Sequence, residues 1–375
     1  MLTRNALAAL SDSLRDQMVL SVFLDGRTSD PAARTAWRST LAANLRALRD
    51  SAAAEKPREL AQLDDSLALL ERHLAPIQGA LSAPGYVAFV TPDRVVLAET
   101  VPVAMPNVAV WELGPWISPY LRVQKELRAV VLAVVDARSA RSYRYALGAL
   151  TPVEHFHAHA SPDQPTHMGG APRQSFHTGT RGATTTDATQ RAHQQGTQRM
   201  VRELIEHITS VASADEWIVI GGMATRAGLV LTMLPAAARH RAVVAAGLSP
   251  MTAPSALRRA ARDWGRRLRQ RLDLEYVESA IAHAAERGRG SVGEDATRAA
   301  LQIDDVHMLL TSMRFMHDRP RVAEELTRLA LAGGATVEVV TGVAADRLDR
   351  AGGIAAILRY VAPATSAMAM AGVMG

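Results

Sequence analysis

Apolar residues recur along the first part of the chain with the spacing of short strands and amphipathic helices. The run from Met18 to Asp25 is rich in β-forming side chains and predicts a strand. A helix is predicted next, and its buried side carries Trp37, Leu41, Leu45 and Leu48. A second helix and three short strands follow, the strands at residues 86–90, 95–98 and 108–113. This pattern predicts an N-terminal α+β domain over residues 1–124.

The second region begins with three predicted strands in succession. Residues 129–136 are nearly all apolar, which predicts a strand covered on both faces, whereas residues 139–147 alternate between polar and apolar side chains. A third strand is predicted at residues 150–157, and helices and strands alternate after it. Strand hairpins followed by alternating helices and strands predict a mixed sheet flanked by helices, over residues 125–272.

The third region carries the pattern of a small layered domain. A short helix is expected from Ala280 to Arg287. The remaining expected elements are three strands and a helix, at residues 306–310, 336–340, 354–360 and 319–331. Together they predict an α/β/α sandwich over residues 273–361, whereas the small, Met-rich and aperiodic residues 362–375 predict a disordered tail.

A long polar stretch interrupts the second region between His159 and Asp187. It holds three prolines and several glycines, and it contains no apolar run that forms a strand or a helix. A loop of this length inside a compact domain is usually functional or disordered. It leads into a helix that ends near Val211, whose apolar stripe includes Met200 and Leu204. We therefore expect a basic loop, residues 159–187, mounted on a long helix as a probe for a polyanionic partner.

Composition supports an anionic partner only in part. The 375 residues carry a formal net charge of +5 and a pI of about 9.9. Nearly all of the positive charge is arginine, a bias that genome composition can produce, so only the placement of the arginines is informative. The chain has no cysteine, which excludes disulfides and thiolate metal sites, and no apolar run of membrane-spanning length. We expect a soluble cytoplasmic protein with no membrane association.

The densest group of positive charges lies on a helix predicted from Ala253 to about Arg271. Its arginines either cover apolar surface with their stems and pair with carboxylates, or contact phosphates, and the sequence favours neither interpretation. The candidate RNA-binding residues of the whole chain are Arg173, His177, Arg191, Arg199, Arg258, Arg262, Arg266 and Arg269.

Metal and cofactor chemistry find little support in the sequence. His155, His157 and His159 alternate, so their rings are placed on one face of a strand and its exit, which suits either a metal site or a polar strand edge. We predict the polar edge and no metal. Gly221-Gly222 lacks both the dinucleotide fingerprint and the lysine of a P-loop, and no serine nucleophile elbow is present, so no cofactor and no catalytic residue are predicted.

Three features resemble the bacterial branch of the archaeo-eukaryotic release factor and Pelota superfamily. The ending Asp346-Arg-Leu-Asp-Arg-Ala-Gly-Gly-Ile-Ala-Ala-Ile-Leu-Arg-Tyr360 is very similar to the signature that closes the third domain of that superfamily. The loop and its long helix resemble the middle domain, and residues 86–93 with the strand at 130–136 resemble the passage between domains one and two. The resemblance implies a three-domain α+β and α/β protein whose middle domain is ribonuclease-H-like.

The resemblance also implies roles for residues of the loop. Release factors carry Gly-Gly-Gln there, and its glutamine positions water against the peptidyl-tRNA ester. Counting back from the helix places Gly182-Ala183-Thr184 at that position, next to Arg181, so the second glycine and the glutamine are replaced. Gly169-Gly170 is followed by Ala171, and Gln174 is four residues beyond Gly170. A threonine side chain does not offer an amide at the same reach.

These features lead to three functional hypotheses. The first is a tRNA-mimicking factor that binds the ribosomal A site of idle or stalled ribosomes, of hibernation or stress type, without peptidyl-tRNA hydrolysis. The ribosome and its rRNA are then the partners, and a translation GTPase is a candidate companion. The alternative is a ribosome-rescue hydrolase that releases nascent chains. A metal-dependent nuclease ranks last, because only Asp136 is placed suggestively for it.

Overall fold

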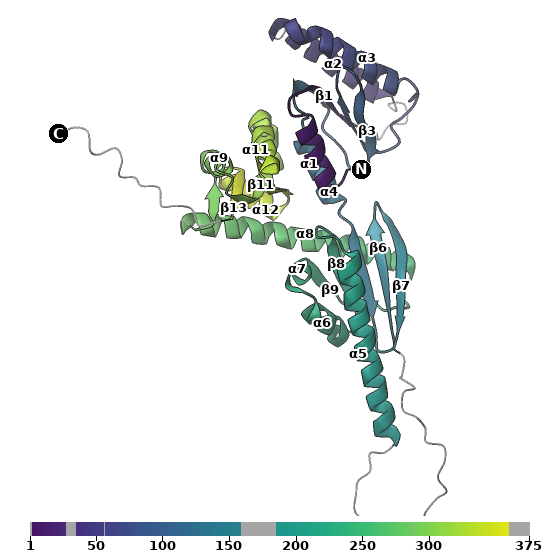
Figure 1. The fold of residues 1–375 in the computed structure, drawn as a ribbon. Coiled ribbons are helices and arrows are strands. Elements are labelled where there is room, and N and C mark those ends of the chain that lie inside the picture. Colours follow the sequence, from purple (N-terminus) through teal and green to yellow (C-terminus); the bar gives the residue numbers. More distant parts are fainter. Residues whose placement is uncertain (1, 28–34, 56, 159–184, 287, 360–375) are drawn as a thin grey trace, which may run out of the picture. The chain divides into compact units, whose positions relative to one another are not determined.

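The computed structural model describes residues 2–27, 35–55, 57–158, 185–286 and 288–359. Within these ranges the chain forms three sheets with helices packed against them (Figure 1). It divides into two compact units, one made of Met1–Leu127 with Asp273–Gly375 and the other of Arg128–Leu272. We call them the split unit and the inserted unit. The predicted boundaries of three domains, after residues 124 and 272, stay a prediction.

The first sheet belongs to the split unit and is wholly antiparallel. Its strands are β1 (Met18–Asp25), β2 (Gly85–Val90), β3 (Val95–Val101) and β4 (Val108–Leu113), in the order β3-β2-β1-β4. Helices α2 (Ala36–Glu55) and α3 (Leu60–Leu74) cover one face, and a 3-10 turn, η2 (Pro57–Glu59), precedes α3. The predicted buried positions Trp37, Leu41 and Leu45 pack in this core, as the helical spacing requires.

Strand β1 is buried on both faces because each face meets a different core. Leu20, Val22 and Leu24 pack with α2 and α3. The alternate residues Val19 and Phe23 face a second core, which includes side chains from the C-terminal part of the chain. Residues far apart in sequence therefore share one hydrophobic core within the split unit.

The second sheet of the split unit is mixed and lies between two layers of helices. Its strands are β10 (Gly290–Val292), β11 (Val306–Ser312), β12 (Thr336–Val340) and β13 (Ile354–Leu358), in the order β10-β13-β11-β12. The helices around it are α9 (Glu294–Gln302), α10 (Met313–Asp318), α11 (Pro320–Ala332) and α12 (Val343–Arg350). Side chains of α9 and α11 pack on one face, and α12 with the end of α8 (Pro254–Ala285) packs on the other. The predicted α/β/α sandwich is confirmed.

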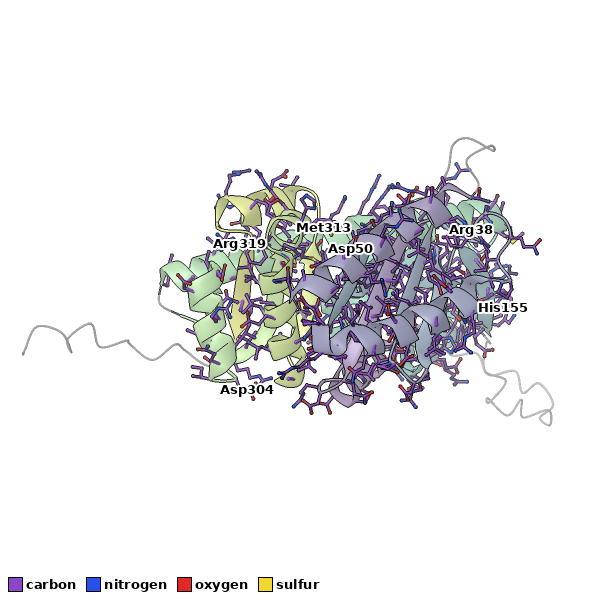
Figure 2. All side chains as sticks on the ribbon, turned by 90° about the horizontal axis from the view of Figure 1, so that it is seen from above. Arg38, Asp50, His155, Asp304, Met313 and Arg319 are labelled. Atoms are coloured by element: carbon purple, nitrogen blue, oxygen red, sulfur yellow. The ribbon has the colours of Figure 1, made fainter. Side chains whose placement is uncertain are left out.

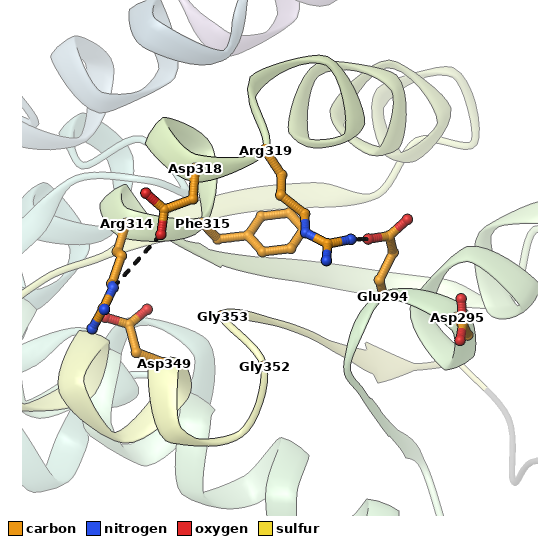
Figure 3. Close-up of a pocket in the computed structure, with 9 residues that line it drawn as sticks. All are labelled: Glu294, Asp295, Arg314, Phe315, Asp318, Arg319, Asp349, Gly352 and Gly353. Carbon is orange, nitrogen blue, oxygen red and sulfur yellow. Dashed lines mark hydrogen bonds and ion pairs between the residues drawn. The ribbon is translucent and has the colours of Figure 1, made fainter.

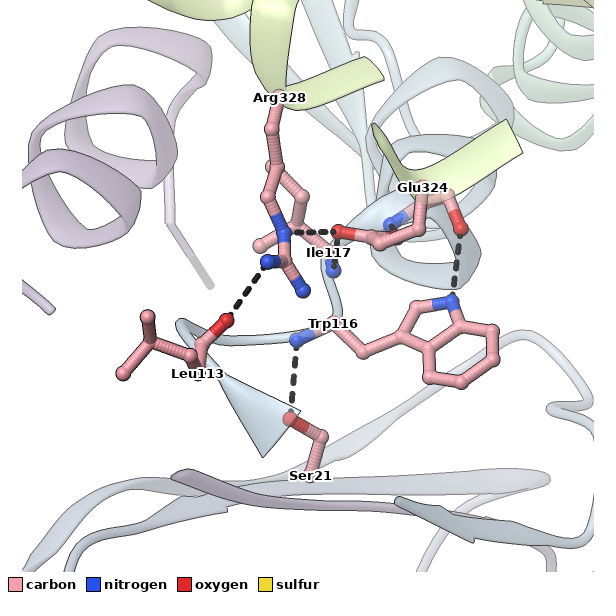
Figure 4. A network of polar contacts seen from close by, with 7 residues as sticks. Ser21, Leu113, Trp116, Ile117, Glu324 and Arg328 are labelled. Atoms are coloured by element: carbon pink, nitrogen blue, oxygen red, sulfur yellow. Dashed lines mark hydrogen bonds and ion pairs between the residues drawn. The ribbon is translucent and has the colours of Figure 1, made fainter. Parts of the chain in front are cut away.

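A buried carboxylate joins α11 to the N-terminus of α4 (Ser118–Glu126), as Figure 4 shows. The side chain of Glu324 accepts hydrogen bonds from the backbone N–H groups of Ile117 (2.8 Å) and Ser118 (2.9 Å). Arg328 donates to the same carboxylate at 3.3 Å and to the carbonyl of Leu113 at 2.6 Å. Burial raises the pKa of Glu324, while the backbone and guanidinium donors oppose that rise. Glu324 supplies the cap that α4 lacks locally.

A buried lysine forms a second polar link inside the split unit. The ammonium group of Lys125, at the end of α4, lies 2.5 Å from the carboxylate of Asp273 and 3.1 Å from that of Glu338. All three side chains are at least 95% buried. The backbone N–H and the hydroxyl of Thr341 donate to the other oxygen of Asp273. Burial raises the pKa of Asp273, and Lys125 opposes the rise.

The inserted unit is a five-stranded mixed sheet with helices on both faces. Its strands are β5 (Val130–Val135), β6 (Ser139–Ala146), β7 (Ala149–His157), β8 (Trp217–Gly222) and β9 (Ala242–Ala245), in the order β7-β6-β5-β8-β9. The first three are antiparallel, and β5, β8 and β9 are parallel. Helices α5 (Thr185–Val211), α6 (Ala224–Met233) and α7 (Ala236–His240) pack on one face. The predicted mixed sheet flanked by helices is confirmed.

One predicted helix end is wrong. The sequence analysis ended one helix near Arg271 and began another at Ala280, but α8 runs without interruption from Pro254 to Ala285. No glycine or proline occurs between Arg266 and Ala285, and the apolar positions Leu268, Leu272 and Val277 continue the helical spacing. Helix α1 (Arg4–Ser13) precedes β1, helix α5 agrees with expectation, and α4, α7, α10, α12 and strand β10 were not predicted.

The cap on α4 predicts a large effect for one substitution. Glu324→Ala leaves two buried N–H groups and Arg328 without their acceptor, so we expect the free energy of unfolding to fall by about 2 kcal/mol or more. Urea unfolding followed by circular dichroism measures the change. The control is Glu325→Ala, which removes a neighbouring, half-exposed carboxylate that pairs with Arg298. It is expected to cost less than about 1 kcal/mol. Equal losses in the two variants would contradict the capping role.

The lysine link predicts a stability loss that depends on pH. Lys125→Met leaves the carboxylates of Asp273 and Glu338 buried without a cation, at a cost of about 3–5 kcal/mol near pH 7. The pKa of Asp273, already raised by burial, then rises further. The folded state then binds more protons than the unfolded state, so the variant loses stability as pH rises.

We therefore expect the difference from the native chain to be larger at pH 8 than near pH 5, measured by urea unfolding at both values. The control is Arg122→Met on the same helix, whose ion pair with Glu126 is partly exposed. A deficit of Lys125→Met that stays constant with pH would contradict the assignment.

Candidate functional site

The tip of the predicted probe lies outside the described residues. So do the candidate loop residues Gly169, Gly170, Arg173, Gln174, His177, Arg181, Gly182, Ala183 and Thr184. His159, the third member of the predicted histidine face, lies outside them as well. The helix that follows the loop is described from Thr185, and it fixes where the loop returns to the inserted unit.

Helix α5 is anchored to the sheet by its C-terminal half only. Buried side chains begin at Thr197 and Met200 and continue to Ile208, where they pack on β5 and β8. The hydroxyl of Thr197 donates to the carbonyl of Ala137, which ties the helix to the end of β5. The N-terminal half extends beyond the sheet, as Figure 1 shows. With 27 residues, α5 is about 40 Å long, and its N-terminal end, which follows the loop in sequence, lies beyond the sheet.

Of the two candidate arginines on α5, the structure describes the side chain of only one. Arg199 is exposed on the free face of the helix. Arg191 lies in α5, but its side chain is outside the described part of the chain. The sequence prediction of an exposed basic helix therefore has a structural counterpart at Arg199.

Helix α8, which carries the other predicted arginines, packs closely against the sheet. Its apolar side carries Leu257, Ala261, Leu268 and Leu272, all buried. Gly265 lies on that same side, and a Cβ there would be 2.8 Å from a methyl group of Val130 on β5. The close approach requires glycine, because a larger residue lifts the helix from the sheet.

Three of the four predicted arginines on α8 are exposed, namely Arg258, Arg262 and Arg266, and we call them the arginine row. Arg262 and Arg266 share one carboxylate, that of Asp263, at 3.0 and 3.4 Å. One acid for three guanidinium groups leaves an excess of positive charge. Arg269 is partly covered instead, and its Nε atom is buried with no hydrogen-bond partner among the described residues.

The polar groups that suggested metal or hydrolytic chemistry have structural roles. The Asp136 carboxylate accepts hydrogen bonds at 2.7 Å from the backbone N–H groups of Arg138 and Ser139, so it forms the turn between β5 and β6. The hydroxyl of Ser142 lies 2.9 Å from Nε2 of His207, but Ser142 is 1% exposed and out of a substrate's reach. Within the described ranges, no group of three or more metal-binding side chains occurs.

A cavity of about 490 Å³ in the split unit was missed by the sequence analysis (Figure 3). Its lining is Glu294, Asp295, Arg314, Phe315, Asp318, Arg319, Asp349, Gly352 and Gly353. Two ion pairs form within the lining: Arg319 donates to Glu294 at 2.7 Å, and Arg314 lies 3.7 Å from Asp318. With four carboxylates and two guanidinium groups, the lining carries an excess of negative charge.

The same cavity gives a physical reason for the glycine pair in the predicted family signature. Gly352 and Gly353 have φ values of +104° and +79°, in a region that favours glycine. A Cβ on Gly353 would lie 2.8 Å from the side chain of Phe315. The pair turns the chain from α12 into β13, whose residues Ile354 to Ala356 are fully buried. Both glycines are needed for the shape of the backbone.

Comparison with known proteins finds a family match over part of the chain. A mixed sheet that carries a loop and a long helix is the arrangement expected of a release-factor-type middle domain. Residues 115–265 match the model of bacterial archaeo-eukaryotic release factor family 10. The match confirms the predicted resemblance to the bacterial branch of the archaeo-eukaryotic release factors, over the part that includes the loop, α5, Arg258 and Arg262.

The chain also matches solved structures at low identity. One is Saccharomyces cerevisiae Dom34, a translation termination-like factor involved in RNA quality control and interacting with Hbs1. It is 12% identical to this chain, and the match covers 63% of this chain and 64% of Dom34 with a TM-score of 0.40. Archaeoglobus fulgidus Pelota is 16% identical, with 74% and 79% covered and a TM-score of 0.32. The archaeal termination factor aRF1 is 17% identical, with 96% and 99% covered and a TM-score of 0.26. The match to Dom34 thus spans less than two thirds of its length.

Two further comparisons are negative. No curated protein matches the sequence. None of the helices in the described ranges combines the length and the apolar character that crossing a membrane requires.

The packing of α8 predicts opposite effects for two glycine substitutions. Gly265→Ala forces a methyl group against Val130, so we expect a loss of about 1–3 kcal/mol in the free energy of unfolding. The matched control is Gly228→Ala in α6, where a Cβ meets nothing within 4 Å. That change is expected to stabilise by up to about 1 kcal/mol, because alanine favours helices. Thermal unfolding of both variants measures the signs, and stabilisation by Gly265→Ala would contradict the close approach.

Proposed function

We propose that this protein is a ribosome-associated, tRNA-mimicking factor that occupies the A site of idle or stalled ribosomes without hydrolysing peptidyl-tRNA. The observation that carries the proposal is the match of residues 115–265 to a release factor family, combined with Gly182-Ala183-Thr184 in place of Gly-Gly-Gln. The domain is retained while the residue that positions water is replaced. Binding is therefore the function that this arrangement favours.

Charge on the inserted unit supports binding to rRNA. The arginine row and Arg199 are exposed, and the row has one carboxylate for three guanidinium groups. Arginine binds phosphate through two parallel N–H donors, and each contact releases counterions. The loop residues Arg173, His177 and Arg181 would extend these contacts to the tip, toward the peptidyl-transferase centre. Within this proposal the protein is cytoplasmic, and a translation GTPase is a candidate companion.

Cosedimentation with vacant ribosomes at increasing salt tests the binding. We expect the native chain to pellet with ribosomes at low salt and to dissociate as salt rises. Replacing Arg258, Arg262 and Arg266 together by glutamine should weaken binding and reduce the slope of log affinity against log salt by about 0.7–0.9 per lost phosphate contact. The control removes three exposed, carboxylate-paired arginines of the split unit, Arg15, Arg49 and Arg347. A native chain that stays in the supernatant at low salt would refute the proposal.

A release assay separates this function from ribosome rescue. Ribosomes with labelled peptidyl-tRNA in the P site are mixed with saturating protein, and free peptide is counted. We expect no release above background. Release that Gln174→Ala or Thr184→Ala abolishes would instead assign a rescue hydrolase. Adding a translation GTPase with GTP to the same mixture tests whether a companion changes occupancy of the A site.

A further inference from the structure

Strands β6 and β7, at one side of the inserted unit's sheet, carry a second group of polar and aromatic side chains, separate from the arginine row. Strands β6 and β7 pair in register, with Arg141 opposite His155 and Tyr145 opposite Leu150. Tyr143 stands between them on β6, and His157 extends the row on β7. Both histidines are exposed and both tyrosines are partly exposed. We call Arg141, Tyr143, Tyr145, His155 and His157 the aromatic row.

The aromatic row lies on the same side of the sheet as α8. Directly opposed residues of an antiparallel pair point to the same face, and Tyr145 pairs with Val130. Val130 is the residue that Gly265 of α8 approaches. The other face of β6 carries Ser142 and packs toward α5, through its contact with His207. The row therefore continues the face of the sheet on which α8 packs.

Contacts within the row keep its groups in place. Arg141 donates to Nε2 of His155 at 3.5 Å and to the carbonyl of Pro250 at 3.3 Å. The ring centroids of His155 and His157 are 4.0 Å apart and tilted by 51°. Desolvation lowers the pKa of His155, and the neighbouring His157 and Arg141 lower it further. His155 lies at the surface in Figure 2.

The aromatic row contains no acidic side chain from β6 or β7. Glu154 is the one acidic residue in β6 and β7, and it pairs with Ser142 on the opposite face. The row thus combines aromatic rings with positive charge and carries no carboxylate of its own strands. That combination complements a polyanion with planar groups.

The exposed edge of the sheet is poorly suited to pairing with a strand of a protein partner. Strand β7 is an edge strand, which in principle accepts another strand. Pro152 lacks an N–H donor, and the register shifts at Ser142/Tyr143, next to it. Both features interrupt the ladder that an added strand needs.

We propose that the aromatic row binds unpaired RNA, with bases stacked on Tyr143, Tyr145 and the histidine rings and phosphates directed to Arg141. Stacking needs bases that are free of a duplex, so the ligand class is single-stranded RNA. Strand β7 leads directly into residue 158 and the loop, so the row lies at the base of the predicted probe. The inference deepens the proposed function, on which it rests only for the statement that this RNA is ribosomal.

Fluorescence anisotropy with a labelled oligouridylate of about ten nucleotides tests the row on the full chain. Tyr143→Leu with Tyr145→Leu keeps the apolar bulk but removes the rings that stack. We expect binding about tenfold weaker or more, with an unchanged salt slope, because stacking releases no counterions. Tyr143→Phe with Tyr145→Phe should bind like the native chain. Arg141→Gln should lower the salt slope instead.

Two controls make the result specific. Thr151→Ala alters the opposite face of the same hairpin, since Thr151 pairs with Arg144, and it should leave binding unchanged. Urea unfolding of each variant confirms that the inserted unit is folded. The proposal is overturned if the leucine variant binds oligouridylate like the native chain, or if duplex RNA of equal length binds as tightly.

Ribosome cosedimentation of the same variants separates this inference from the proposed function. A chain that binds oligouridylate through the tyrosines but never pellets with ribosomes refutes the proposed function and leaves the aromatic row as an RNA site. A chain that pellets with ribosomes but whose oligouridylate binding ignores the tyrosines refutes the row alone.

Discussion

The ammonium group of Lys125, buried between two carboxylates, is the constraint on which the split unit depends. Its chain leaves for the inserted unit after Leu127 and returns at Asp273, and Lys125 binds Asp273 directly. The contact therefore holds the departing and returning segments together within the split unit. A buried charge is costly unless it is paired, so the end of α4 and this point of α8 have to meet in one register. Glu338 brings β12 to the same point.

Local pattern was enough to predict most strands and the layered sheets. The apolar run at residues 129–136 and the alternation at residues 139–147 correspond to β5 and β6, because burial on two faces or on one leaves different periods in the sequence. The error at α8 was a break placed near Arg271, although the apolar spacing continues through Leu272 and Val277. The Glu324 cap and the Lys125 link join residues about 150 or more positions apart, and no local signal marks such pairs.

The candidate arginines show the same limit at the level of single side chains. With 3.6 residues per turn, Arg258 and Arg269 point within about 20° of each other around α8, so their spacing alone predicts equal exposure. Only Arg258 is exposed, because neighbouring segments cover Arg269. Periodicity fixes a direction around a helix, and the tertiary packing decides what lies there. The aromatic row was missed for a related reason: its members sit on two strands whose register includes a bulge.

In the two proposals, the arginine row and the aromatic row of the inserted unit contribute to RNA recognition in different ways. Exposed guanidinium groups act at long range and raise the rate of encounter, but they do not distinguish paired from unpaired RNA. Aromatic rings act only in contact, and they select bases that are free to stack. Because Gly265 brings α8 close to the sheet next to Tyr145, both kinds of group belong to one face of one rigid scaffold. A strand of RNA drawn in by charge would therefore meet the rings without a rearrangement of the fold.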